Sequence, residues 1–193
     1  INDKNINSFL TLFFKDHKNK ALFLNHNQIT DKGWDILIDH IMEDNIIEHL
    51  VLAHNTLQLN NCSLNKLNRF LYKNETINFL VLSHNKIKDE GIINLSRAIN
   101  RNRSIKHLIL NDNQMTDKGL DILLFSLMNH NACESIFISN NKLSNISLSK
   151  IILFLKKNKR IKRLNISGNN FTDLEQLSEI VRICKSQKII LTV

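Results

Sequence analysis

Residues 108–119 read LILNDNQMTDKG, and versions of this stretch recur along the whole chain. The other copies are LFLNHNQITDKG from residue 22, LVLAHNTL from 50, LVLSHNKIKDEG from 80, IFISNNKL from 136 and LNISGNNFTD from 164. The shared pattern is apolar-x-apolar-x-x-Asn-x-apolar. Its asparagines are spaced 28, 30, 28, 28 and 28 residues apart, at Asn27, Asn55, Asn85, Asn113, Asn141 and Asn169. A fixed period of this length predicts a solenoid of stacked repeats.

The pattern resembles the leucine-rich repeat family. The period, together with a glycine six residues after Asn27, Asn85 and Asn113, looks like its ribonuclease-inhibitor-like subfamily. This resemblance implies an α/β horseshoe with parallel strands on the concave face and helices on the convex face. It also implies that the concave face holds another protein.

We expect one leucine-rich repeat domain over residues 1–193. Residues 21–187 would form six repeats, and residues 188–193 would add a terminal strand. Residues 1–20 would form an N-terminal helical half-repeat, with a helix over 4–17. That half-repeat is either a natural cap or the continuation of a longer protein, and the sequence leaves both readings open.

Each repeat should run through a strand of about four residues, a turn, a helix and a return. The six asparagines can donate and accept at the turn, so we interpret them as a structural ladder. Thr30, Asp31, Asp89, Thr116 and Asp117 are the expected helix N-caps. Left-handed helix C-caps are expected at four further asparagines, because Asn tolerates that conformation: Asn45, Asn74, Asn102 and Asn158.

The residue between the two core residues of each strand should face outward on the concave side. Five of these six residues are apolar, and an exposed apolar column framed by polar residues is typical of a protein-binding surface. The column is Phe23, Val51, Val81, Ile109, Phe137 and Asn165. Beside it we place His49, Phe79, His107 and Arg163, and we expect Phe23, Phe79 and Phe137 to anchor a partner. The alternatives are that β-branched residues merely suit strands, or that another part of the protein covers the column.

His26, His54 and His84 form a further column, directly before the turn asparagines. We expect no metal site there, because an even ladder does not converge on a tetrahedral shell. A pH-sensitive surface is the alternative. The cysteines Cys62, Cys133 and Cys184 form no C-x-x-C pair, which suits a reducing compartment, and Cys133 falls in a core column.

The net charge of +8 is uneven, since no acidic residue occurs among residues 135–172. A basic edge is predicted at Lys156, Lys157, Lys159, Arg160 and Lys162, and a smaller basic group comprises Arg97, Arg101, Arg103 and Lys106. These cations could steer an anionic partner, or they could simply complement helix dipoles. No aromatic residues are interleaved with them, so we expect neither a nucleic-acid nor a membrane partner.

The sequence contains no phosphate loop, G-x-S-x-G or H-E-x-x-H motif, so we expect no enzymatic activity and no cofactor. The predicted function is a monomeric protein-interaction module with a protein partner. No apolar run of membrane-spanning length and no leader segment are visible, which favours the cytoplasm. Asparagine and isoleucine are abundant and proline is absent, which we interpret as the codon bias of an AT-rich genome; this is compatible with a bacterial effector secreted into the host cell cytoplasm. The alternative is a regulator of a small GTPase, because the GTPase-activating protein of Ran resembles this subfamily and uses the horseshoe edge.

Overall fold

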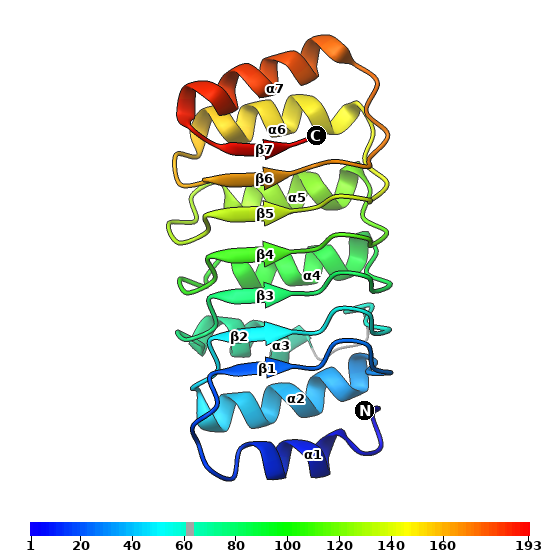
Figure 1. Ribbon diagram of the computed structural model, residues 1–193, viewed down its shortest axis with the longest axis vertical. Coiled ribbons are helices and arrows are strands. Elements are labelled where there is room, and N and C mark those ends of the chain that lie inside the picture. The colour runs from blue at the N-terminus through cyan, green and yellow to red at the C-terminus, as the bar shows by residue number, and fades with distance from the viewer. Residues whose placement is uncertain (61–63) are drawn as a thin grey trace.

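The computed structural model describes residues 1–60 and 64–193. Helices and strands alternate strictly along the chain, and Figure 1 shows the strands stacked on one side with the helices behind them. The helices are α1 (Ile6–Phe13), α2 (Asp31–Asp44), α3 (Leu64–Lys73), α4 (Asp89–Ile99), α5 (Asp117–Leu127), α6 (Ile146–Lys157) and α7 (Leu174–Gln187). The strands are β1 (Ala21–Phe23), β2 (His49–Val51), β3 (Phe79–Val81), β4 (His107–Ile109), β5 (Ser135–Phe137), β6 (Arg163–Asn165) and β7 (Ile190–Thr192).

The strands form one parallel sheet in sequence order, from β1 to β7. The register joins equivalent positions of successive repeats: Leu22 pairs with Leu50, and Leu108 with Ile136. The two extra residues of the second repeat leave this register intact, since Leu50 still pairs with Leu80. The α/β solenoid predicted from the repeat period is therefore confirmed, with strands of three residues rather than four.

The core lies between the sheet and the helices. The apolar pair in each of the six repeats, such as Leu108 and Leu110, is buried, and so are the inward positions of α2 to α6, whereas Leu177 of α7 and Leu191 of β7 are only partly buried. Cys133 is fully buried, as its place in a core column predicted, and Trp34 is fully buried as well. Cys62 lies outside the described residues.

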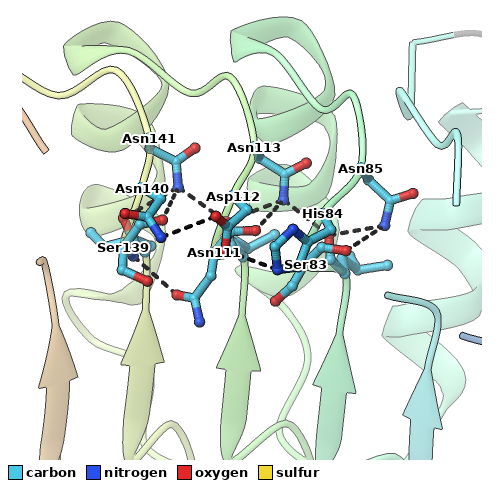
Figure 2. Close-up of polar contacts among 12 residues, drawn as sticks. Ser83, His84, Asn85, Asn111, Asp112, Asn113, Ser139, Asn140 and Asn141 are labelled. Atoms are coloured by element: carbon cyan, nitrogen blue, oxygen red, sulfur yellow. Dashed lines mark hydrogen bonds and ion pairs between the residues drawn. The ribbon is translucent and has the colours of Figure 1, made fainter. Parts of the chain in front are cut away.

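The turn asparagines join each repeat to the one before it (Figure 2). The Asn113 side-chain oxygen accepts a hydrogen bond from the Ile87 backbone N–H at 3.1 Å. Its amide nitrogen donates to the Leu82 and Leu110 carbonyl oxygens, at 2.9 and 3.1 Å. Asn55, Asn85 and Asn141 repeat this pattern. The predicted structural role of the ladder is confirmed.

The aspartates at the helix starts have a different role from the predicted one. Thr30 caps α2 by accepting from the Lys32 N–H, whereas Asp31, Asp89 and Asp117 are the first residues of their helices. Each carboxylate reaches into the next repeat. Asp89 accepts from both the backbone N–H and the hydroxyl of Thr116, at 2.7 and 2.6 Å. The N-cap prediction for these aspartates is wrong because the neighbouring turn offers more donors than their own helix end.

The predicted left-handed C-caps occur only at Asn45, with φ of 45°. Asn158 is the C-cap of α6 but has an extended backbone, and Asn74 and Asn102 do not have positive φ; the side chains of all three accept bonds from the backbone that follows. Asn102, for example, accepts from the Ser104 and Ile105 N–H groups at 3.0 and 2.8 Å. The N-terminal helix is also shorter than the predicted 4–17, since α1 ends at Phe13.

Candidate functional site

The outward side chains of the strands form the candidate surface, on the face of the sheet opposite the helices. Parallel register places Phe23, Val51 and Val81 side by side across β1, β2 and β3. Phe23 is the most open of this column, with 65% of its surface exposed. Val51, Val81 and Phe137 are half-buried.

Two members of the predicted column are engaged within the fold, one fully and one in part. Ile109 is only 8% exposed, because Val81 and Phe137 flank it in the paired strands. The Asn165 side-chain oxygen accepts from both the N–H and the hydroxyl of Ser167, so this side chain folds onto its own turn. Ile109 is therefore a buried supporting residue rather than a contact residue, whereas Asn165 stays partly exposed and remains a predicted contact residue.

A row of rings runs parallel to the apolar column. The rings of His49 and Phe79 are stacked with their centroids 5.4 Å apart, and the Phe79 ring lies 5.4 Å from that of His107. His107 in turn is 2.9 Å from the Ser135 hydroxyl through Nδ1. These three rings, which we call the aromatic row, form a continuous line across β2, β3 and β4, in which the His107 ring is tilted by 53° from that of Phe79.

The aromatic row ends at a polar hollow of about 500 Å³. This cationic pocket is lined by His107, Glu134, Ser135, Lys162, Arg163, Lys188 and Ile190. The structure thus brings together Arg163 and His107, predicted for the concave face, with Lys162, predicted for the basic edge. Three cations and one carboxylate leave the pocket with positive charge.

The electrostatics of the pocket favour an incoming anion. Lys162 pairs with Glu134 at 2.9 Å and holds the pKa of that carboxyl below its usual range. Burial lowers the pKa of His107; Glu134 opposes this effect, while Arg163 and Lys106 add to it. His107 is therefore neutral at pH 7. Arg163 and Lys188 make no ion pair with any residue in the described ranges 1–60 and 64–193.

The predicted basic edge is only partly free. Lys156 forms an ion pair with Glu179 at 2.6 Å, and Lys162 is occupied by Glu134. Lys157, Lys159 and Arg160 are exposed and make no ion pair within the described part of the chain. The edge therefore contributes three free charges beside the cationic pocket.

The histidine column is a stack of parallel rings. His26 and His54 have ring centroids 4.1 Å apart, and His54 and His84 have theirs 3.9 Å apart. All three residues have a left-handed backbone, with φ between 50° and 56°. His84 Nε2 lies 3.1 Å from the Asp112 carboxylate, which also accepts from the Asn140 amide (Figure 2). Burial, together with the His84 and His26 charges, lowers the pKa of His54.

This stack does not suit a metal ion, because parallel rings direct their nitrogens along parallel lines rather than toward one point. Among residues 1–60 and 64–193, no cluster of three or more His, Cys, Asp or Glu side chains could hold one.

The sequence reasoning missed Lys188 and Glu134 as members of the site. Glu134 could have been found, since Glu134 and Lys162 stand 28 residues apart, as do the paired Lys20 and Glu48. Opposite charges at one repeat period indicate a cross-strand pair. Lys188 carries no such signal, because it lies at the left-handed C-cap of α7, after the last full repeat.

Comparison with known proteins agrees with this geometry. The family model described as Leucine Rich repeat matches residues 73–96 and 101–123, and no curated protein sequence matches the chain. The fold is a leucine-rich repeat solenoid. Among solved structures, an internalin from Listeria monocytogenes is similar with a TM-score of 0.58 at 19% identity, over 96% of this chain and 49% of that one.

Two further structures share the leucine-rich repeat fold. Actin-binding site 2 of leiomodin-1 gives a TM-score of 0.54 at 14% identity, covering 96% of this chain and 86% of that one. The tropomodulin C-terminal domain from Caenorhabditis elegans gives 0.52 at 14% identity, covering 96% and 92%. In the part of the solenoid that the structure describes, no helix is long and apolar enough to cross a membrane.

Proposed function

We propose that this protein is an interaction module that binds a protein partner on its concave face. The observation that carries the proposal is the junction of an exposed apolar and aromatic surface with a cationic pocket. Phe23 and the aromatic row supply the rigid, apolar contact area that tends to dominate interface energy. Arg163 and Lys188 supply charge that selects a partner by complementarity.

The partner segment that fits has an apolar or aromatic side chain followed by a carboxylate. The apolar group would lie on the Phe79 ring, and the carboxylate would enter the cationic pocket to meet Arg163. A guanidinium binds a carboxylate through two parallel hydrogen bonds, which fixes orientation as well as charge. Capture by such a surface combines a salt-resistant apolar component with a salt-sensitive ionic one.

The test is affinity capture from a host-type cell lysate with the Phe23→Ala, Phe79→Ala, Phe137→Ala triple variant. We expect capture of the partner to fall by at least about tenfold, since three anchor side chains are removed. The matched control is Phe125→Ala with Leu153→Ala, which truncates two exposed side chains on the helical face. Capture that survives the triple variant, with the fold verified by circular dichroism, would place the site elsewhere.

A second candidate is binding of an anionic protein by the basic edge alone, favoured by the free charges of Lys157, Lys159 and Arg160. Replacing these three by glutamate should abolish capture in that case and leave concave-face capture largely intact. No feature of the described residues points specifically to a small GTPase.

The proposal includes two more specific expectations, one on the type of repeat and one on the origin of the protein. The 28-residue period, with a helix in each repeat, supports the ribonuclease-inhibitor-like type of repeat. The abundance of asparagine and isoleucine, interpreted as the codon bias of an AT-rich genome, supports an origin in an intracellular bacterium, from which the protein would be secreted into the cytoplasm of a host cell. A translocation assay with a reporter fused to the chain tests this, and a reporter retained in the bacterium would count against it.

A further inference from the structure

A second hollow, of about 550 Å³, lies on the helical side of the molecule between α3 and α4. We call it the arginine pocket. It is lined by Asn68, Arg69, Tyr72, Arg97, Ala98, Asn100 and Arg101. Three of these seven residues are arginines and none is a carboxylate. The sequence had indicated only a basic group around Arg97, without the α3 side chains that complete the wall.

Helical spacing explains how the walls form. Arg69 and Tyr72 stand three residues apart on α3 and therefore share one face of that helix. Arg97 lies in the last turn of α4, and Arg101 lies in the turn that follows the helix, two residues after Ile99. Arg97 occupies the same repeat position as Arg69, 28 residues earlier. The other residues at that repeat position are Asp39, Phe125, Leu153 and Val181. Since an acid or an apolar residue serves equally well there, the solenoid does not require arginine at this position.

Neither helix capping nor ion pairing accounts for these arginines. The carbonyls at the end of α4 are served by Arg103, whose guanidinium donates to the Asn100 and Asn102 oxygens at 3.2 and 2.8 Å. Lys66, also on α3, pairs with Asp39 at 2.6 Å. Arg69, Arg97 and Arg101 are exposed and make no ion pair with any residue in the described ranges 1–60 and 64–193. Three adjacent like charges repel one another, so their proximity is unfavourable until an anion joins them.

We propose that the arginine pocket binds a small anion that carries two or more phosphate groups on a ring-bearing scaffold. The planar fork of a guanidinium matches a phosphate with two parallel hydrogen bonds, and three forks offer more donors than one carboxylate can accept. The volume is within the range of small-ligand sites and exceeds that of a single phosphate. The Tyr72 side chain, 62% exposed at the wall, offers a flat surface for the ring. Asn68 and Asn100 offer amides to hydroxyl groups.

The shared chemistry is a polyphosphorylated ring, whether it is free in solution or the headgroup of a lipid. The proposal is independent of the concave face, because the two hollows share no lining residue.

The experiment is isothermal titration of the full chain with inositol 1,4,5-trisphosphate and with ATP at about 0.1 M salt. We expect at least one of them to bind with a dissociation constant below about 100 μM. Arg97→Ala and Arg69→Ala should each weaken binding by about tenfold. Arg97→Lys should weaken it severalfold, because the charge remains but the fork is lost.

The matched control is Lys157→Ala with Arg160→Ala, which removes two exposed charges outside the pocket; it should change affinity less than twofold. Flotation with vesicles that contain phosphatidylinositol 4,5-bisphosphate distinguishes the sources: binding identifies a headgroup site, and its absence a site for the soluble anion. Two results would overturn the proposal. One is no binding of either anion below about 1 mM. The other is equal loss in the pocket and control variants, with all variants folded by circular dichroism, since that indicates attraction by net charge alone.

Discussion

At the level of single residues, the repeat period allows equivalent positions of different repeats to be compared. Repeats one, two, three and five place an asparagine in the return segment, and the fourth repeat places His130 there. His130 Nδ1 accepts from the Ala132 and Cys133 N–H groups, at 3.3 and 3.0 Å, just as the Asn102 side-chain oxygen accepts from the two equivalent N–H groups of its own repeat. His130 is 2% exposed. The His130 imidazole has thus replaced the asparagine amide, and its Nδ1 atom accepts the same two hydrogen bonds. Protonation of Nδ1 would abolish both bonds.

This replacement predicts acid sensitivity. Burial, assisted by the Arg103 charge, lowers the pKa of His130 from 6.5 to about 4. Between these pH values the unfolded chain binds the proton and the folded chain does not, so stability falls as the pH drops through this range. The shift corresponds to roughly 3 kcal/mol in the free energy of unfolding. His130→Asn should preserve both accepted bonds and flatten this part of the stability profile.

Urea unfolding at pH 7 and pH 4.5 measures the effect. A variant at His40, which lies beside Asn7 on the outer face of α2, is the control and should keep the full slope. The lowered pKa of His54 contributes in the same direction, so some acid sensitivity should remain in His130→Asn. An unchanged profile in His130→Asn would contradict the assignment.

At the scale of elements, the helix starts determine how closely repeats can approach. A Cβ added at Gly91 would lie 2.0 Å from the Gln58 carbonyl oxygen, so only glycine allows the preceding turn to pass this close. In the fifth repeat Ser147 takes the place of the glycine, and its hydroxyl donates to Asp117. Burial raises the pKa of Asp117, but hydrogen bonds from Ser147 and Ser144 outweigh that effect and keep it below the usual value. The last two repeats therefore do without glycine because their turns are bonded differently.

Gly91→Ala should destabilise the protein by about 2–3 kcal/mol, because the obstructing atom belongs to the backbone. Gly119→Ala is the matched variant. Its Cβ would lie 2.5 Å from an Asp89 carboxylate oxygen, which belongs to a side chain and can move, so the cost should be smaller. Chemical denaturation of both variants gives the comparison. Equal costs would indicate that the close approach is not what selects glycine at residue 91.

The helices and strands also show which features of a repeat sequence can be predicted and which cannot. Strands, core positions and the Asn113 type of ladder were predicted because six copies of the pattern report the same structural requirement. The Asp89 bond to the next repeat was misassigned, because helix capping and reaching forward require the same residue type in the same place. The Arg69 wall and Lys188 were missed, since each depends on side chains that do not recur. Periodicity reveals what repeats share, whereas a binding site lies in what they do not share.

At the level of the whole molecule, each repeat is stabilised by hydrogen bonds with its neighbours. Asn113→Ala leaves the Ile87 N–H buried without its acceptor, and the Leu82 and Leu110 carbonyl oxygens each lose one of two side-chain donors, keeping those of Asn85 and Asn141. The expected cost is about 3 kcal/mol in the free energy of unfolding. Asn113→Asp should cost more, because it places a carboxylate against two carbonyl oxygens. Asn25→Ala, at an exposed position, should be nearly neutral.

Amide hydrogen exchange locates the damage. Exchange in β3 and β4 should accelerate more than in β6 for both Asn113 variants, because nearest-neighbour contacts dominate a solenoid. Uniform acceleration over all seven strands would instead mean that the array unfolds as a single cooperative unit.

The side chain of each ladder asparagine from Asn55 to Asn141 bonds only within its own repeat and to the preceding one, and this has a genetic consequence. Duplication or deletion of one 28-residue unit would leave every surviving bond with an equivalent partner, so such an event is close to silent for folding. It would nevertheless move the aromatic row relative to the cationic pocket by one strand spacing, about 4.8 Å. The number of repeats can therefore change with little loss of folding stability. Selection for partner binding, in contrast, would keep the distance between the aromatic row and the cationic pocket constant.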